Sequence, residues 1–184
     1  MAELRSIQDA ESVAESMESF SVNDITVEEC RAQIACMLNE LWHSRLPAIH
    51  WSNVVRNTHY VCYAFKYKQA IIGVGIWSSP VAQNRMKDGK TILELRRLAL
   101  SDVCPRNTAT KIISCMIKAI KTKFPDIKKL VSYQDKDVHH GTIYKASNWI
   151  AADEVKLADW SNKGRKRSAL QSDANKIRWE YYIK

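Results

Sequence analysis

The chain has 184 residues and a formal net charge of +8 at pH 7. This length suits one compact domain, and a hydrophobic content of 46% is enough for an ordinary core. No apolar run approaches the ~20 residues that a membrane-spanning helix needs. Met1–Phe20 is acidic and lacks the basic start and apolar middle of a signal peptide. The sequence therefore argues against a membrane partner and predicts a cytoplasmic protein.

The cysteines and histidines show no metal-binding pattern. The five cysteines are scattered without a C-x-x-C pair, which argues against disulfides and against a cysteine zinc site. The five histidines have no recognised metal spacing either. We therefore assign no metal ligands.

Charge is distributed unevenly along the chain. Residues 1–29 contain eight acidic side chains and one basic one, a local net charge of −7, which leaves 27 basic and 12 acidic side chains elsewhere, a net charge of +15. Such a basic part favours polyanionic partners, namely nucleic acid or coenzyme phosphates, although a solubilising surface charge is the alternative. Residues 1–24, rich in Glu and Ser, predict a flexible acidic arm ahead of a folded domain at 25–184.

The first folded segment has apolar residues at three- and four-residue steps, which predicts an amphipathic helix. Thr26 and Glu29 would form a capping box at its start. Its apolar stripe consists of Val27, Cys30, Ile34, Met37, Leu38 and Leu41. Next, Tyr60–Tyr67 and Ala70–Trp77 are rich in aromatic and β-branched residues, which predicts a β-hairpin.

Strands and helices alternate in the rest of the chain. Their predicted order is strand Ile92–Leu100, helix Thr108–Lys123, strand Lys128–Tyr133, short helix Gly141–Trp149, and strands Ile150–Leu157 and Ile177–Ile183. A hairpin followed by strand–helix units predicts a mixed α/β sheet with crossover helices.

The turn between the strand ending at Leu100 and the next helix is a candidate anion site. Free backbone N–H groups at a helix N-terminus attract negative charge. Arg106, Asn107, Thr108 and Thr110 surround that end and are suited to a pyrophosphate. An ordinary capped helix is the alternative.

The order of elements resembles the acetyltransferase-like (GNAT) superfamily, in which this strand–turn–helix holds coenzyme A. The resemblance implies a mostly antiparallel sheet with a splayed central strand pair, and acetyl-coenzyme A or a related acyl donor as cofactor. The superfamily's loop is Q/R-x-x-G-x-G/A, whereas this chain has no glycine there. The implied cofactor contacts are Leu98, Leu100, Arg106, Asn107, Thr108, Ala109 and Thr110.

Within that superfamily, short patches across residues 45–150 resemble the phage Mom group. They are His50-Trp51-Ser52, Glu94-Leu95-Arg96-Arg97-Leu98, Asn107-Thr-Ala-Thr110, Tyr133-Gln-Asp135, Gly141-Thr-Ile-Tyr144-Lys-Ala146 and Asn148-Trp149. The stretch that begins at Tyr133 is the most specific. Trp51 stands where the group has Tyr, and Thr110 stands where it has Ser.

The resemblance implies an enzyme that converts adenine in DNA to an N6-(carbamoylmethyl)adenine-like base and so protects the DNA from restriction endonucleases. Its partner would be double-stranded DNA with the target adenine flipped out of the helix. The N6 amino group is a poor nucleophile, so the site must take a proton from it and stabilise charge on the donor.

The same resemblance implies catalytic roles for Asp135, Tyr144, Arg97 and His50. Asp135 follows an apolar strand, at the edge of the sheet where α/β proteins place their sites. It would accept the N6 proton or hydrogen-bond to the amino group, and a helix-capping Asp is the alternative. Tyr144 would stack on the base, donate a proton or orient the donor, unless it is a core tyrosine.

Arg97 lies on the central strand, where a buried charge needs a partner. It would bind a carboxylate or phosphate, and an ion pair with Glu94 is the alternative. Strand alternation predicts that Arg96 and Arg97 point to opposite faces. His50 would act as a base or a metal ligand, and a structural histidine is its alternative.

Expected DNA contacts mix cations with stacking side chains. They are Trp51, Ser52, His139, His140, Trp160, Lys163, Arg165, Lys166 and Arg167. A solvated loop is the alternative for the last five and for the two histidines. Two other functions remain open: an ordinary N-acetyltransferase acting on a small amine or a protein, and a non-catalytic DNA-binding protein with a GNAT-like fold.

Overall fold

The computed structural model describes residues 20–43, 46–80, 90–137, 139–155 and 176–183. They form one seven-stranded sheet in the order β1-β2-β3-β4-β5-β7-β6. The strands are β1 Ile25–Glu29, β2 Tyr60–Tyr67, β3 Ala70–Ser78, β4 Ile92–Leu100, β5 Lys129–Asp135, β6 Ile150–Val155 and β7 Lys176–Tyr182. The predicted arm up to residue 19 and the basic loop with Trp160, Lys163, Arg165, Lys166 and Arg167 lie outside the described residues.

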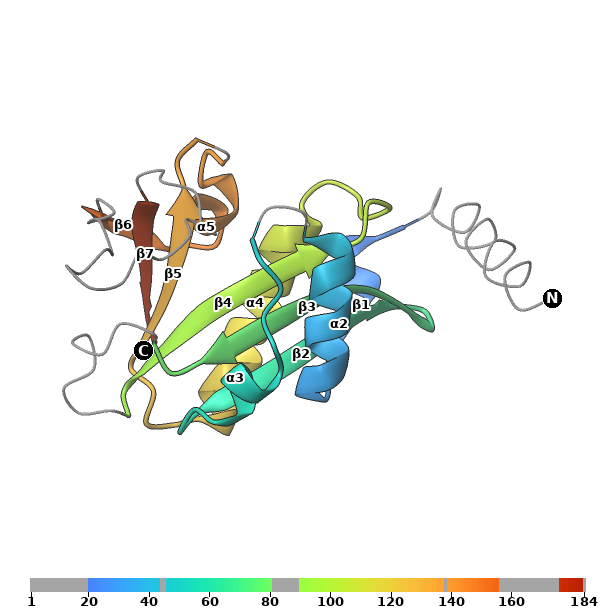
Figure 1. Cartoon of the computed structure of the whole chain (residues 1–184). Coiled ribbons are helices and arrows are strands. Elements are labelled where there is room, and N and C mark those ends of the chain that lie inside the picture. Colours follow the sequence, from blue (N-terminus) through green and yellow to red (C-terminus); the bar gives the residue numbers. More distant parts are fainter. Residues whose placement is uncertain (1–19, 44–45, 81–89, 138, 156–175, 184) are drawn as a thin grey trace.

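Helices cover both faces of the sheet (Figure 1). Helix α2 (Ala32–Trp42) and the short α3 (Ser52–Val55) lie on one face, and α4 (Thr108–Lys123) lies on the other. The short α5 (Thr142–Ala146) follows β5, and a 3-10 turn, η1 (Val22–Asp24), precedes β1. The mixed α/β architecture expected from the sequence is confirmed. Among the described residues, no helix is both long and apolar enough to cross a membrane.

The prediction of a helix beginning near Thr26 is wrong. Residues 25–29 form the edge strand β1, in which Thr26 pairs with Lys66 of β2. The helix starts only at Ala32. Glu29 therefore caps nothing, and its carboxylate lies 2.7 Å from Lys123 Nζ of α4. Pairing with β2, which no local pattern reveals, outweighs the helical periodicity of this segment.

The predicted apolar stripe of α2 is also wrong. Three of its members, Ile34, Met37 and Leu41, are 38%, 61% and 72% exposed. The face that meets the sheet carries smaller side chains, namely Ala32, Ala35, Cys36 and Asn39. Small residues bring the helix close to the sheet, so the larger apolar side chains remain outside.

The two central strands diverge, as expected. The parallel pairing of β4 with β5 runs from Ile92↔Lys129 only as far as Leu95↔Ser132. Beyond Leu95, β4 continues to Leu100, and beyond Ser132, β5 continues to Asp135. This opening between the ends of β4 and β5, called the splay below, is the architectural feature on which the candidate site is built (Figure 1).

A β-bulge in β4 lies at the start of the splay. Ile76 of β3 pairs with Arg97 and Trp77 pairs with Leu95, so Arg96 has no cross-strand partner of its own. An extra residue reverses the alternation of side chains beyond it. The expectation that Arg96 and Arg97 point to opposite faces is wrong for this reason, because Arg96 reaches Ser78 and Arg97 reaches Pro47, both on the α2 side.

Candidate functional site

The N-terminus of α4 has an open backbone. Asn107, the residue before the helix, has φ +71° and ψ −1°, a left-handed conformation. Asn is among the few residues other than glycine that adopt it readily. Thr108 donates to Pro105 O through its hydroxyl at 2.8 Å. The backbone N–H groups of Ala109 and Thr110 have no acceptor among the described residues.

Asn107 thus replaces the missing glycine of the loop. A left-handed residue ahead of a right-handed helical turn makes a concave run of N–H groups that binds anions. Arg106 is exposed beside it. Leu98 and Leu100 turn their side chains into the core, so they offer only backbone groups to the splay. The expected cofactor contacts are therefore brought to one end of the splay.

Arg97 connects β4 with the segment ahead of α3. Its guanidinium donates to Pro47 O at 3.2 Å and to Arg96 O at 2.7 Å. Burial lowers the pKa of Arg97, and the neighbouring Arg96 lowers it further, while Glu94 and Cys36 oppose the shift. The ion pair considered for Arg97 is made by Arg96, whose Nε lies 3.7 Å from Glu94.

His43, at the end of α2, is a neighbour of Arg97 that sequence reasoning missed. Burial lowers the pKa of His43, and the nearby charges of Arg97 and His139 lower it further. His43 thus follows the helix that packs against β4, the strand that carries Arg97. His140, next to His139, is exposed.

Asp135 is the last residue of β5 and lies beyond the point where β5 stops pairing with β4. Its Oδ1 accepts from the backbone N–H of Asp137 at 3.0 Å, and its carbonyl accepts from His139 N at 3.1 Å. The carboxylate caps a turn and not a helix, since Gly141 occupies the N-cap of α5. One carboxylate oxygen remains available for other contacts within the described part of the chain.

Tyr144 is a buried residue with a polar contact. It is 8% exposed, its ring stacks on Trp179 at 5.3 Å, and Trp149 packs edge-on at 5.5 Å. Its hydroxyl lies 2.8 Å from Ser132 Oγ. Burial raises the pKa of Tyr144, with the Ser132 hydrogen bond opposing the shift. The phenol therefore stays protonated and reaches the residue where β4 and β5 part.

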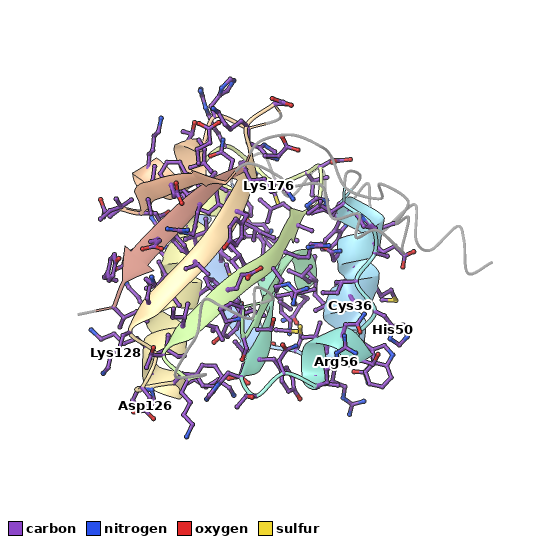
Figure 2. The ribbon with its side chains drawn as sticks, turned by 60° about the vertical axis from the view of Figure 1, so that its left-hand side comes forward. Cys36, His50, Arg56, Asp126, Lys128 and Lys176 are labelled. Atoms are coloured by element: carbon purple, nitrogen blue, oxygen red, sulfur yellow. The ribbon has the colours of Figure 1, made fainter. Side chains whose placement is uncertain are left out.

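His50, Trp51 and Ser52 form an exposed corner. His50 Nδ1 lies 2.7 Å from Ser52 Oγ, and the His50 and Trp51 rings are 5.5 Å apart. Figure 2 shows Cys36, His50 and Arg56 on the α2–α3 side of the sheet. Lys128 lies toward the other edge of the sheet in the same view. The hydrogen bond from Arg97 to Pro47 fixes the chain three residues before this corner. No cluster of three or more metal-ligating side chains occurs in the described segments.

Asn39 is a second residue that sequence reasoning missed. It is 1% exposed on the sheet-facing side of α2. In the sequence, Asn39 is a polar residue three positions after Cys36, which would place it on the same helix face. The apolar stripe predicted from the sequence instead put the buried face on the opposite side of the helix. Arg97 and Asp135 lie on the diverging ends of β4 and β5, and Tyr144 contacts Ser132 where the pairing of these strands ends. His50 to Ser52 lie on the α2–α3 side.

This sheet, splay and helix arrangement is the fold of the GNAT acetyltransferases. A GNAT family acetyltransferase from Elizabethkingia anophelis has a TM-score of 0.57 at 16% identity, with 87% of this chain and 99% of that chain covered. A spermidine N-acetyltransferase from Vibrio cholerae has a TM-score of 0.63 at 7% identity, covering 87% and 94%. The ribosomal-protein-S18-alanine N-acetyltransferase of Escherichia coli has a TM-score of 0.60 at 10% identity, covering 86% and 94%.

The chain belongs to the Mom protein family, whose model matches residues 24–180. It is similar to the methylcarbamoylase of Escherichia phage Mu, with 27% identity over 107 residues. That alignment covers 54% of this chain and 44% of the Mu protein, so the match spans less than half of that relative.

Proposed function

We propose that this protein modifies the N6 amino group of adenine in DNA and attaches a carbamoylmethyl group to it. The family match over residues 24–180 carries this proposal, supported by the similarity to the phage Mu methylcarbamoylase. The excess of basic over acidic residues beyond residue 29 supports DNA as the substrate. Protection of the modified DNA from restriction endonucleases is the proposed consequence.

A coenzyme A-type donor fits the residues at the start of α4. The left-handed Asn107 and the free amides of Ala109 and Thr110 suit a pyrophosphate. The exposed Arg106 adds a positive charge there, and the β4 backbone at Leu98 and Leu100 borders the splay. When bound, such a coenzyme would supply an activated carbon and a thiol leaving group.

The residues at the splay divide the acid–base work of this transfer. The N6 nitrogen of the flipped adenine would bond to the donor carbon as that carbon's bond to the leaving group breaks, and Asp135 would take the proton that N6 releases. Tyr144 remains protonated because burial raises its pKa. Its hydroxyl, held by Ser132, donates a hydrogen bond to the leaving group. Arg97 stabilises negative charge that develops on the donor.

The α2–α3 side of the splay is proposed to receive the DNA. Trp51 is 38% exposed and presents a flat ring for stacking, and His50 and Ser52 stand next to it. His139 and His140 are exposed in the segment after β5 and would contact the DNA from there. The basic segment with Trp160, Lys163, Arg165, Lys166 and Arg167, which lies outside the described residues, would add contacts to the DNA backbone.

Mass spectrometry of nucleosides tests the proposal. Plasmid DNA is taken from cells that express the protein or its Asp135→Asn variant and is digested to nucleosides. We expect a heavier deoxyadenosine only with the unmutated chain, and its mass identifies the attached group. Unmodified DNA from cells that contain abundant folded protein, tested in a host known to support modification by a Mom protein, contradicts the proposal.

An ordinary N-acetyltransferase is the second candidate, and the α4 anion site favours it independently of DNA. That function predicts release of free thiol from acetyl-coenzyme A only when a small amine or a peptide amine is added. Measuring thiol release with a panel of amines, with and without duplex DNA, separates the two candidates.

A further inference from the structure

Asn39 is an unusual residue for the interior of this protein. It is 1% exposed, yet neither its Nδ2 nor its Oδ1 has a hydrogen-bond partner among the residues the structure describes. Nε of Arg97 is also buried and without a partner among them. Buried polar groups are normally paired, because leaving them unpaired is costly. Such atoms therefore indicate a site for a ligand.

The unpaired atoms of Asn39 and Arg97 belong to one region. Cys36, Asn39 and His43 follow one another at helical spacing, so they share a face of α2. Helix α2 packs against β3 and β4, and Arg97 turns its side chain to the face of β4 that meets α2. Asn39 lies on the buried, sheet-facing side of α2, so its amide and Arg97 Nε both lie between α2 and the sheet.

We propose that Asn39 and Arg97 recognise the terminal carboxamide of the transferred group. The inference rests on the proposed function. Asn39 Nδ2 and Arg97 Nε supply donors for the carbonyl oxygen of a primary amide, and Asn39 Oδ1 accepts a hydrogen bond from its NH₂. A carboxylate or a methyl group offers no hydrogen for Oδ1, so Asn39 selects a carbamoyl-bearing group over an acetate-like or acetyl one.

The burial of these atoms favours a small group over the purine base. The side-chain atoms concerned are out of reach of solvent in the free chain. Arg97 keeps its hydrogen bonds to Pro47 O and Arg96 O through Nη2 and Nη1, which leaves Nε for the ligand. A flipped adenine is far larger, and the proposed function places it on the exposed side, near Trp51.

The Asn39→Leu variant tests the inference because Leu has a similar volume and no polar atoms. We expect its melting temperature to equal or exceed that of the wild type, since an unpaired amide is removed. We also expect modified deoxyadenosine to fall by at least about tenfold, with the affinity for a duplex oligonucleotide within about twofold of wild type. A structural asparagine would give the reverse pattern, a lower melting temperature with product retained.

A matched control is the Tyr63→Phe variant, which removes a buried hydroxyl that also has no partner within the described residues. Tyr63 is 2% exposed and packs in the hydrophobic core that also contains the buried residues of α4, so product formation should not change. Asn39→Ala, which only deletes atoms, serves the same comparison if the Asn39→Leu chain fails to fold. Product within about twofold of wild type in either folded variant overturns the inference.

Two further outcomes distinguish the carboxamide role of Asn39 from an adenine-binding role and from failure of the proposed function. Loss of DNA affinity together with product in Asn39→Leu would assign Asn39 to the adenine and overturn the carboxamide role. Absence of modified deoxyadenosine with the wild-type chain itself would contradict the proposed function and not this assignment. Acetamide, added to the purified wild-type chain, should then still raise the melting temperature more than it does for Asn39→Leu; equal shifts overturn the assignment.

Discussion

The Tyr144 hydroxyl lies 2.8 Å from Ser132 Oγ, and Ser132 is the last β5 residue paired with β4. A buried aromatic residue on α5 thereby places its only polar atom at the origin of the splay. This relationship reconciles the two interpretations of Tyr144 that the sequence left open. The ring is a core element between Trp149 and Trp179, and the proposed function assigns the hydroxyl to the transfer.

Tyr144→Phe should separate these two contributions. We expect a loss of about 1 kcal/mol in unfolding free energy, since one hydrogen bond is removed and the ring is kept. If the hydroxyl serves the transfer, the rate of product formation falls by about 10²-fold or more. Ser132→Ala is the control, because it removes the partner and keeps the phenol. Equal rates for both variants, each close to wild type, would show that the pair is purely structural.

The conformation of Asn107 leads to a prediction about the anion site. Its φ of +71° disfavours β-branched residues, so Asn107→Val should lower the unfolding free energy by about 1–2 kcal/mol and weaken coenzyme A binding. Asn107→Gly should keep the unfolding free energy and the binding free energy of coenzyme A within a few tenths of a kcal/mol of wild type. Calorimetric titration with coenzyme A, alongside thermal melts, measures both quantities.

Asn148 provides a matched control for that experiment. It has φ +61° just after α5 and lies outside the turn and helix start of residues 106–110, although its neighbour Ser147 contacts Thr110 O at 3.5 Å. Asn148→Val should therefore destabilise the chain to a similar degree without changing coenzyme A affinity beyond the effect of unfolded material. Equal losses of affinity in both variants would mean that backbone strain, and not the anion site, is responsible.

Much of the fold follows from local patterns, but the N-terminal part does not. The hairpin, β4, α4 and the later strands were predicted because each has strong periodicity or clear turn residues. Thr26 to Glu29 were misassigned because pairing with β2 is a non-local interaction. The buried face of α2 was misassigned because apolar periodicity identifies an amphipathic helix but not how closely it packs, and here Ala35 and Cys36 allow a close approach.

The site was predictable only in part, for related physical reasons. Motif resemblance predicted roles for Asp135, Tyr144 and Arg97, and the structure places Asp135 and Arg97 on the diverging ends of β5 and β4. Their roles in the reaction stay predictions. The resemblance did not reveal His43 or Asn39, because their importance depends on the bulge in β4 that turns Arg97 toward α2. A bulge inserts one residue without any mark in the sequence, so strand alternation gave the wrong face.

The assignment of the faces of α2 can itself be tested. Met37→Glu places a charge where the side chain is 61% exposed, so the unfolding free energy should change by less than about 0.5 kcal/mol. Cys36→Glu places the same charge on the buried face and should destabilise the chain by several times that amount. Urea denaturation of the two variants makes the comparison, and similar midpoints would contradict the packing of α2 described above.

Arg97→Lys probes the hydrogen bond that fixes the segment ahead of His50. Lysine keeps the charge but cannot donate to Pro47 O and Arg96 O in the same planar arrangement, so we expect a loss of about 1.5–3 kcal/mol in unfolding free energy. Arg56→Lys is the control, since Arg56 is exposed and its side chain makes no hydrogen bond or ion pair with the described residues. Thermal melts of both variants suffice, and equal stability would remove Arg97 from this anchoring role.

His43 should make the stability of the chain sensitive to acid. Burial, together with Arg97 and His139, lowers the pKa of His43 below its ordinary value of 6.5, so the unfolded chain binds this proton more readily than the folded one. The stability that neutral His43 contributes is therefore fully present above pH 6.5 and declines as the pH falls through the lower, folded-state pKa.

His43→Gln removes the titrating group, so its melting temperature should decrease less between neutral and mildly acidic pH than that of wild type. Melts recorded across that interval provide the measurement, with His59→Gln as the histidine control. A wild-type pH dependence that persists unchanged in His43→Gln would place the acid sensitivity at another group.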